Sequence, residues 1–278
     1  MLGGVGEVEP WDLRQLMIGW EGMERAFAGL GGADRFTAAH NQVMTARLAD
    51  QSQPGGHHTY IVARQLITIA MDHHRALLAV MSQSASPCAA WTLLRSVFES
   101  SALASWVLDP TDGLERRRRA QRRTCLDFQQ QRNYQAALRL TMTAPEAASV
   151  AEEVRVAKQL RAEAEELGLS WRQATGDVNL IAELAELTAV RNALGTDAAQ
   201  APRLAALWRG MSGHARGYSY TARVDLDVRW SMSLTGGAQP PATLDPEVFT
   251  AHGNVTGMLL LSAIQLYVQR SRRPLAER

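Results

Sequence analysis

Arg209 and His214 are the residues whose types and spacing suggest chemistry most directly in this chain. They lie in LWRGMSGHARGYS, residues 207–219, where glycines surround both side chains at the predicted end of a helix. An arginine can stabilise a phosphate, and a neutral histidine can act as the general base on a ribose 2′-hydroxyl. The stretch therefore predicts metal-independent RNA cleavage, with Ser212 as a binding or orienting group. The structural alternative is that a helix ends here and His214 bonds to the backbone.

A second candidate is the pair Arg95 and Glu99, which interrupts the apolar stretch CAAWTLLRSVFESSALASWVL. A spacing of four residues puts both side chains on one face of a helix. Burying an unpaired charge is costly, so each side chain needs a partner. The pair predicts either a polar binding site within a helical bundle or a structural ion pair that anchors neighbouring helices.

The arginine-rich segment ERRRRAQRR, residues 115–123, is the third candidate. Its arginines spread around a helix, and Arg116, Arg119 and Arg123 are predicted to bind RNA or another phosphate-containing ligand. The alternative is a solvated face that complements acidic neighbours, and a net charge of only +1 favours it.

Metal chemistry would require Glu99, His73 and His214 to converge from different helices, and the Glu-x-x-His repeats of di-iron bundles do not occur. The neighbouring His73 and His74 lie about 100° apart around a helix, so they cannot both face one metal as ligands four residues apart would. The sequence also has no P-loop, no GxSxG and no strand followed by GxGxxG. We therefore expect no metal and no cofactor, with a carboxylate/histidine metal enzyme left as an alternative.

The elements that position these residues are predicted to be helices. Apolar residues recur at helical spacing, and prolines, glycines and short polar loops separate the segments. About eight helices follow, in an all-α bundle, with one small β-hairpin near residues 220–235. A pair of glycines at 31–32 is expected to end the first helix. The longer helices are predicted at residues 59–83, 87–108, 114–142, 145–168, 177–194, from 202 onward, and 246–270.

The composition fits one soluble domain over residues 1–278, in which residues 1–50 can form a helical appendage. Apolar residues make up 46% of the chain and charged residues 21%, as in ordinary globular proteins. We expect no signal peptide and no membrane-spanning segment, and therefore a cytoplasmic protein. A homodimer is a further expectation, since a two-fold pair of such bundles could bring two sites together.

Two blocks of the sequence resemble a group of mostly uncharacterised all-helical actinobacterial proteins, over roughly residues 60–270. The first block has the form LLRxxxE with a Trp-Leu-x-x-Pro-like ending, and the second has the form WxxxSGxxHG. In the second block this chain has Arg216 where the pattern has histidine. The matching residues are Arg95, Glu99, Trp106 and Pro110 in the first block and Trp208, Ser212 and Gly213 in the second.

The helical make-up and the late Arg-x4-His are also similar to HEPN-type domains, which are often ribonucleases of toxin or defence systems. This chain has Gly210 where those domains usually follow the arginine with a polar residue. The resemblance implies an all-helical fold and a ribonuclease that uses Arg209 and His214. The sequence leaves open whether the protein is an enzyme, and the alternative function is a helical module that binds a small ligand or a partner protein.

Overall fold

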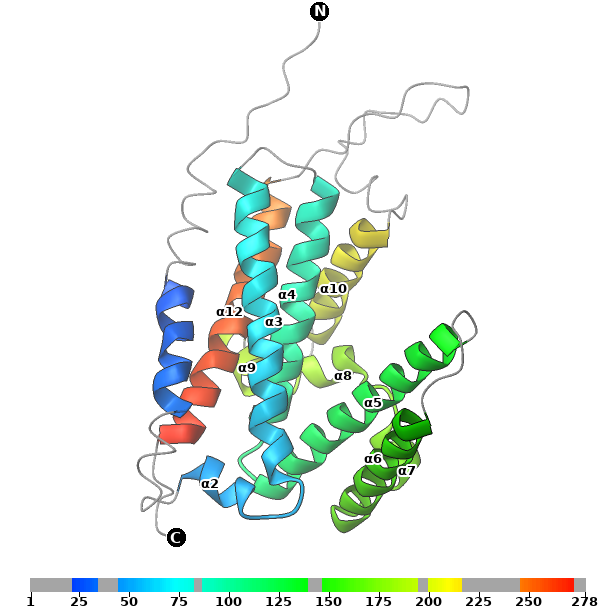
Figure 1. The fold of residues 1–278 in the computed structure, drawn as a ribbon. Helices are drawn as coiled ribbons and strands as arrows, with labels where there is room; N and C mark the ends of the chain where they lie inside the picture. The colour runs from blue at the N-terminus through cyan, green and yellow to red at the C-terminus, as the bar shows by residue number, and fades with distance from the viewer. Residues whose placement is uncertain are drawn as a thin grey trace, which may run out of the picture. The chain divides into compact units, whose positions relative to one another are not determined.

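The computed structural model describes residues 22–34, 45–82, 87–139, 147–194, 200–216 and 246–272. Within these residues the regular elements are helices, which confirms the all-α class (Figure 1). The described helices number eleven rather than about eight, counting the helix over residues 22–34. The hairpin predicted near residues 220–235 lies outside the described residues.

The six long helices begin and end close to where the sequence predicts them. Gly168 has a φ of 71°, a left-handed conformation that glycine adopts without strain, and it follows the end of α6 as expected. The long helices are α3 (Gly56–Ser82), α4 (Pro87–Leu108), α5 (Gly113–Arg139), α6 (Ala147–Glu166), α10 (Gln200–Arg216) and α12 (Pro246–Arg272).

The single helix predicted over residues 177–194 is wrong, because two short helices occupy this stretch. They are α8 (Leu180–Leu184) and α9 (Thr188–Leu194), with a turn in which Leu187 N donates to Leu184 O. Leu184, Leu187 and Val190 are all buried. Residues three apart shift by about 60° per step around an α-helix. A tighter, 3₁₀-like turn keeps the three side chains on one face.

The first helix also differs from its prediction. It continues through Gly31 and Gly32 to residue 34 instead of ending at this pair. A Cβ atom on Gly32 would lie 2.5 Å from a terminal nitrogen of Arg272. The glycine therefore makes room for an arginine side chain from α12, and this contact outweighs the low helix propensity of glycine.

The chain forms two compact units, each made of three stretches of the sequence. The first unit comprises Met1–Gly29, Ile67–Ala102 and Leu180–Ile264, and the second comprises Leu30–Leu66, Leu103–Asn179 and Gln265–Arg278. No described helix is long and apolar enough to cross a membrane.

In the first unit, residues 67–82 of α3, 87–102 of α4 and 246–264 of α12 run alongside α10 (Figure 1). α4 is apolar nearly all round and carries the buried Trp91, whose ring packs edge-on against Phe249 of α12 at 4.9 Å. His252 packs on the same indole at 5.0 Å. These contacts place α4 at the centre of this unit, as an all-round apolar helix requires.

In the second unit, α5 packs against α6 and against two short helices, α2 (Ala46–Gln51) and α7 (Trp171–Ala174). The sequence SWRQATGD, residues 170–177, predicts a loop. Ser170 and Gln173 instead form a capping box there, which starts α7. A small apolar cluster joins the helices, and it contains Cys125, Leu160, Ala164 and Ala174.

Candidate functional site

Arg95 and Glu99 of α4 form an ion pair in the first unit. Arg95 Nε donates to Glu99 Oε1 at 2.9 Å, across one helical turn. The side chains are 21% and 32% exposed, so the pair is neither fully buried nor fully solvated. At this depth each charge is partly desolvated, and the pairing offsets a cost that either charge alone would carry.

Trp208 of α10 completes this pair. Its indole Nε1 donates to the same oxygen, Glu99 Oε1, at 2.9 Å. The Arg95 guanidinium lies over the Trp208 ring, 5.7 Å from its centroid. The two sequence blocks, 109 residues apart, therefore meet in one polar cluster. Sequence reasoning did not select Trp208 as a site residue, although a half-buried indole N–H needs an acceptor and Glu99 offered one.

The Arg95 guanidinium keeps hydrogen-bonding capacity in this arrangement. Its Nε is used by Glu99, and no described residue accepts a hydrogen bond from its two terminal nitrogens. Glu99 and Trp208 hold the planar group from one edge and one face. An arginine positioned in this way can offer two parallel N–H groups to a carboxylate or phosphate.

Ser212 lies one turn after Trp208 on the same face of α10. It is only 5% exposed, and its hydroxyl has no hydrogen-bond partner among the described residues. A buried hydroxyl without a partner costs about 1–3 kcal/mol of free energy. The packing of the described helices therefore does not explain why a serine, rather than an alanine, occupies position 212.

Arg209 and His214, the predicted catalytic pair, both lie within α10. Arg209 is exposed, and the side chain of His214 lies outside the described part of the structure. The helix is continuous between them, so residues five apart are separated by about 140° around its axis. Of the predicted site residues, Arg95 and Glu99 meet each other, and Trp208 of α10 contacts both of them.

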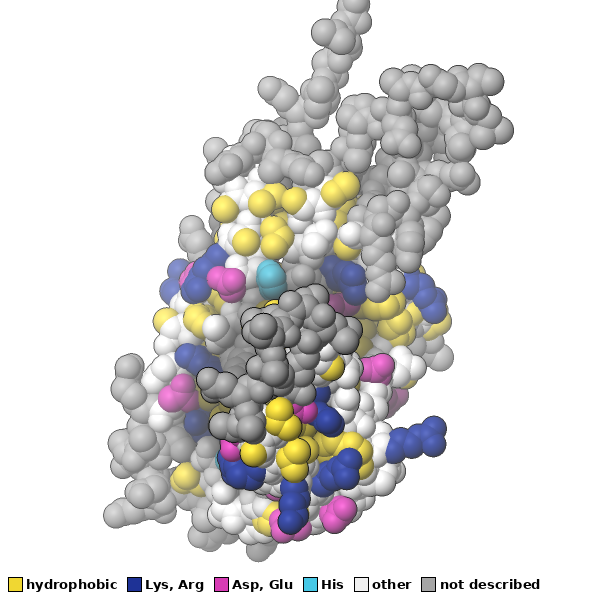
Figure 2. Space-filling model, turned by 45° about the vertical axis from the view of Figure 1, so that its right-hand side comes forward, with side chains coloured by type: hydrophobic (Ala, Val, Ile, Leu, Met, Phe, Trp, Pro, Cys, Tyr) yellow, Lys and Arg dark blue, Asp and Glu magenta, His cyan; other side chains and the backbone are white. Residues whose placement is uncertain are grey.

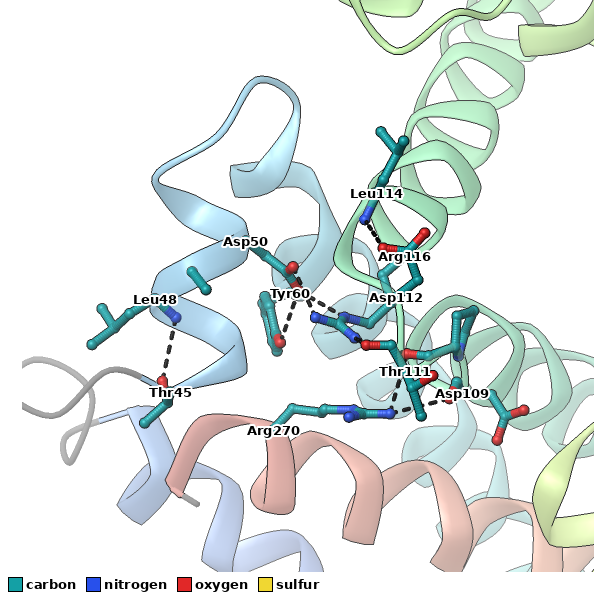
Figure 3. A network of polar contacts seen from close by, with 12 residues as sticks. Thr45, Leu48, Asp50, Tyr60, Asp109, Thr111, Asp112, Leu114, Arg116 and Arg270 are labelled. Atoms are coloured by element: carbon teal, nitrogen blue, oxygen red, sulfur yellow. Dashed lines mark hydrogen bonds and ion pairs between the residues drawn. The ribbon is translucent and has the colours of Figure 1, made fainter. Parts of the chain in front are cut away.

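Arg116 of the arginine-rich helix is buried in the second unit. Its guanidinium forms a two-pronged ion pair with Asp50 of α2, with Nε–Oδ2 at 2.7 Å and a terminal nitrogen–Oδ1 at 2.8 Å. The side chains are only 3% and 2% exposed. Figure 3 shows Tyr60 pointing at the same carboxylate, and its hydroxyl donates to Asp50 Oδ2 at 3.2 Å.

The same guanidinium also binds the turn between α4 and α5. Arg116 donates to the carbonyl oxygens of Pro110 and Thr111, both at 2.8 Å. Arg270 of α12 donates to the carbonyl of Pro110 at 3.1 Å, and burial together with the charge of Arg116 lowers the pKa of Arg270 (Figure 3). Arg116 thus joins α2, α5 and this turn by internal hydrogen bonds.

The other two predicted phosphate-binding arginines also have partners within the chain. Arg119 donates to Glu115 and to the Trp106 carbonyl, and its guanidinium stacks on the Trp106 ring at 5.1 Å. Arg123 pairs with Asp127 at 2.6 Å. On the face that Figure 2 presents, the described Lys and Arg side chains are mixed with acidic and apolar ones. A surface of mixed sign binds the phosphate backbone less well than a basic stripe.

The metal set considered from the sequence joins His73, Glu99 and His214. Among the described residues, one group of three side chains could hold a metal ion, and it consists of His57, His58 and Glu163. His73 and Glu99 do not belong to it.

No protein-family model, curated protein or solved structure matches this chain. In the first unit the two sequence blocks build the cluster of Arg95, Glu99 and Trp208, and Ser212 lies one turn further along α10.

Proposed function

We propose that the protein is a helical binding module for a small ligand that carries an anionic group, a carboxylate or a phosphate. One observation carries the proposal. The Arg95 guanidinium is oriented by Glu99 and Trp208, while its terminal nitrogens make no hydrogen bond to any described residue. The ligand's anionic oxygens would bind these nitrogens, and the buried Ser212 hydroxyl would offer a further hydrogen bond.

The test is a thermal-shift and calorimetric titration with inorganic phosphate and with acetate, as the two sources of anionic oxygen. We expect one of the two to stabilise the native chain, because a ligand that binds only the folded state raises its melting temperature. Arg95→Met should abolish this shift. Arg155→Met is the matched control, since Arg155 is an exposed arginine of α6 that pairs with Glu152 at 2.6 Å.

Trp208→Phe tests the positioning of Arg95 separately from its charge. The variant keeps an aromatic ring beneath the guanidinium and removes only the N–H that binds Glu99. We expect anion affinity to fall by about tenfold, the effect of about 1.4 kcal/mol. Equal anion stabilisation of the native chain, Arg95→Met and Arg155→Met would contradict the proposal, because it would show a general salt effect.

RNA cleavage by Arg209 and His214 receives less support than binding. Their positions lie about 140° apart around α10, so one phosphate would have to reach two faces of the helix. We therefore expect no cleavage of a short oligoribonucleotide by the purified chain. Cleavage that disappears in both Arg209→Ala and His214→Ala would replace the binding proposal with the ribonuclease, alone or as a homodimer.

A cytoplasmic location is part of the same proposal. Cys88 and Cys125 are both free thiols, one exposed and one buried. Free cysteines favour a reducing compartment, where disulfides seldom persist.

A further inference from the structure

A pair of glycines fixes the start of α3 in the second unit, within the segment QPGGHH. Gly55 has a φ of 68°, and a Cβ atom on Gly56 would lie 1.7 Å from the backbone oxygen of Asp50. Only glycine at position 56 allows the end of α2 to approach α3 this closely. The glycines therefore fix the backbone from which the side chains of the next two residues, His57 and His58, project.

His57 and His58 lie together with Glu163 of α6. His58 Nε2 is 2.9 Å from Glu163 Oε2, and the two imidazole rings have their centroids 3.9 Å apart. One ligand atom from each of the three side chains lies within 4.8 Å of the other two. Residues 105 apart in the sequence thus present two imidazole nitrogens and one carboxylate oxygen to one small volume.

These separations are close to those of a metal site. Zn²⁺ bound at about 2.0–2.1 Å in a tetrahedron holds its ligand atoms about 3.3 Å apart. The pair formed by His58 and Glu163 would open by a few tenths of an ångström. The remaining gaps would close by about 1.5 Å or less. Neighbouring helical residues start about 100° apart around the axis, but His57 and His58 lie in the first turn of α3 and their rings converge to 3.9 Å. His57 is exposed, so its ring can turn without disturbing the packing.

The carboxylate is already oriented by a neighbour. Gln159, one turn earlier on α6, donates to Glu163 Oε1 at 2.9 Å and leaves Oε2 toward His58. Metal-binding carboxylates commonly have such a supporting hydrogen bond, which fixes the oxygen that faces the ion. His58 and Glu163 are half-buried and held in place, whereas the exposed His57 can adjust to an ion.

We propose that His57, His58 and Glu163 bind a divalent transition-metal ion, with Zn²⁺ the best match. Two imidazoles and one carboxylate are ligands that zinc prefers, and three protein ligands leave a coordination position for water. A hard cation such as Mg²⁺ prefers an octahedron of oxygen atoms, so it should not compete.

The experiment uses the full chain without an affinity tag, freed of metal by a chelator and titrated calorimetrically with Zn²⁺. We expect stoichiometric binding that excess Mg²⁺ does not displace. His57→Ala and Glu163→Gln should each weaken Zn²⁺ binding by more than about tenfold, at least the loss seen when a mere supporting group is removed. Far-UV circular dichroism should be unchanged in His57→Ala, because that side chain is exposed.

Two matched controls separate this site from adventitious binding. His73→Ala removes a half-exposed histidine of the same helix, and Glu152→Gln removes an exposed carboxylate of α6. Both should bind Zn²⁺ as the native chain does. Co²⁺ should give visible absorption bands that His57→Ala removes. Absence of Zn²⁺ binding, or an equal loss in His73→Ala and His57→Ala, would overturn the proposal.

Discussion

Replacing Arg116 by methionine should destabilise the second unit more than any comparable change in the arginine-rich helix. The guanidinium makes two bonds to Asp50 and two to the carbonyls of Pro110 and Thr111, at 2.7–2.8 Å. Its loss leaves the Asp50 carboxylate 2% exposed in the native packing, with the Tyr60 hydroxyl at 3.2 Å as a weak partner.

The size of the effect follows from this burial. Removing one partner of a buried ion pair costs about 3–5 kcal/mol, because the other charge stays desolvated. A typical domain has a free energy of unfolding of roughly 5–15 kcal/mol, so this cost would be a large part of it. Arg123→Met makes the same chemical change in the same helix. Its partner Asp127 is 52% exposed, so the expected cost is below about 1 kcal/mol.

The assay is equilibrium unfolding in guanidinium chloride, followed by circular dichroism, on the native chain and both variants. We expect Arg116→Met to lower the unfolding midpoint strongly and Arg123→Met to leave it nearly unchanged. The double variant with Asp50→Asn should be less unstable than the sum of the two single changes, because neither buried charge then lacks a partner. Equal midpoints for Arg116→Met and Arg123→Met would refute the claim that the buried pair of Arg116 and Asp50 stabilises the fold.

Three further predictions test other parts of the structure. Burial lowers the pKa of His74 from 6.5 to about 4. Between these two pKa values the unfolded chain binds a proton that the folded chain excludes. The free energy of unfolding should therefore be highest above about pH 6.5 and fall by up to about 3 kcal/mol toward pH 4. Urea titrations of His74→Asn should show no such dependence on pH. Gly56→Ala should lower the melting temperature, since its Cβ would lie 1.7 Å from the Asp50 carbonyl, whereas Gly22→Ala meets no atom within 4 Å and should not. Ser212→Ala should raise stability by about 1 kcal/mol, because it removes a buried hydroxyl that no described residue bonds, and a loss of stability would show that the hydroxyl is bonded.

Local signals in the sequence predict the six long helices. A first-turn proline and an apolar composition all round predicted α4 at the bounds it has, and Gly168 predicted the end of α6. The local signals failed where a distant contact intervened. Gly32 lies within a helix because the side chain of Arg272 occupies the position of its missing Cβ. Arg272 is 240 residues away in the sequence, so no local pattern predicts this contact.

The sites show the same division. The sequence selected Arg95 and Glu99, because a charged pair in an apolar helix is conspicuous, yet only packing brought Trp208 to them from 109 residues away. Among the arginines of residues 115–123, nothing local distinguishes Arg116, which is buried because its partner Asp50 comes from another helix, 66 residues earlier. His57 and His58 come just before the helix that the sequence predicts from residue 59, and only the packing of α6 brings Glu163 beside them. Helix formation depends on neighbours within a few residues, whereas a site depends on which faces of distant helices meet, and burial of apolar surface over the whole chain sets that.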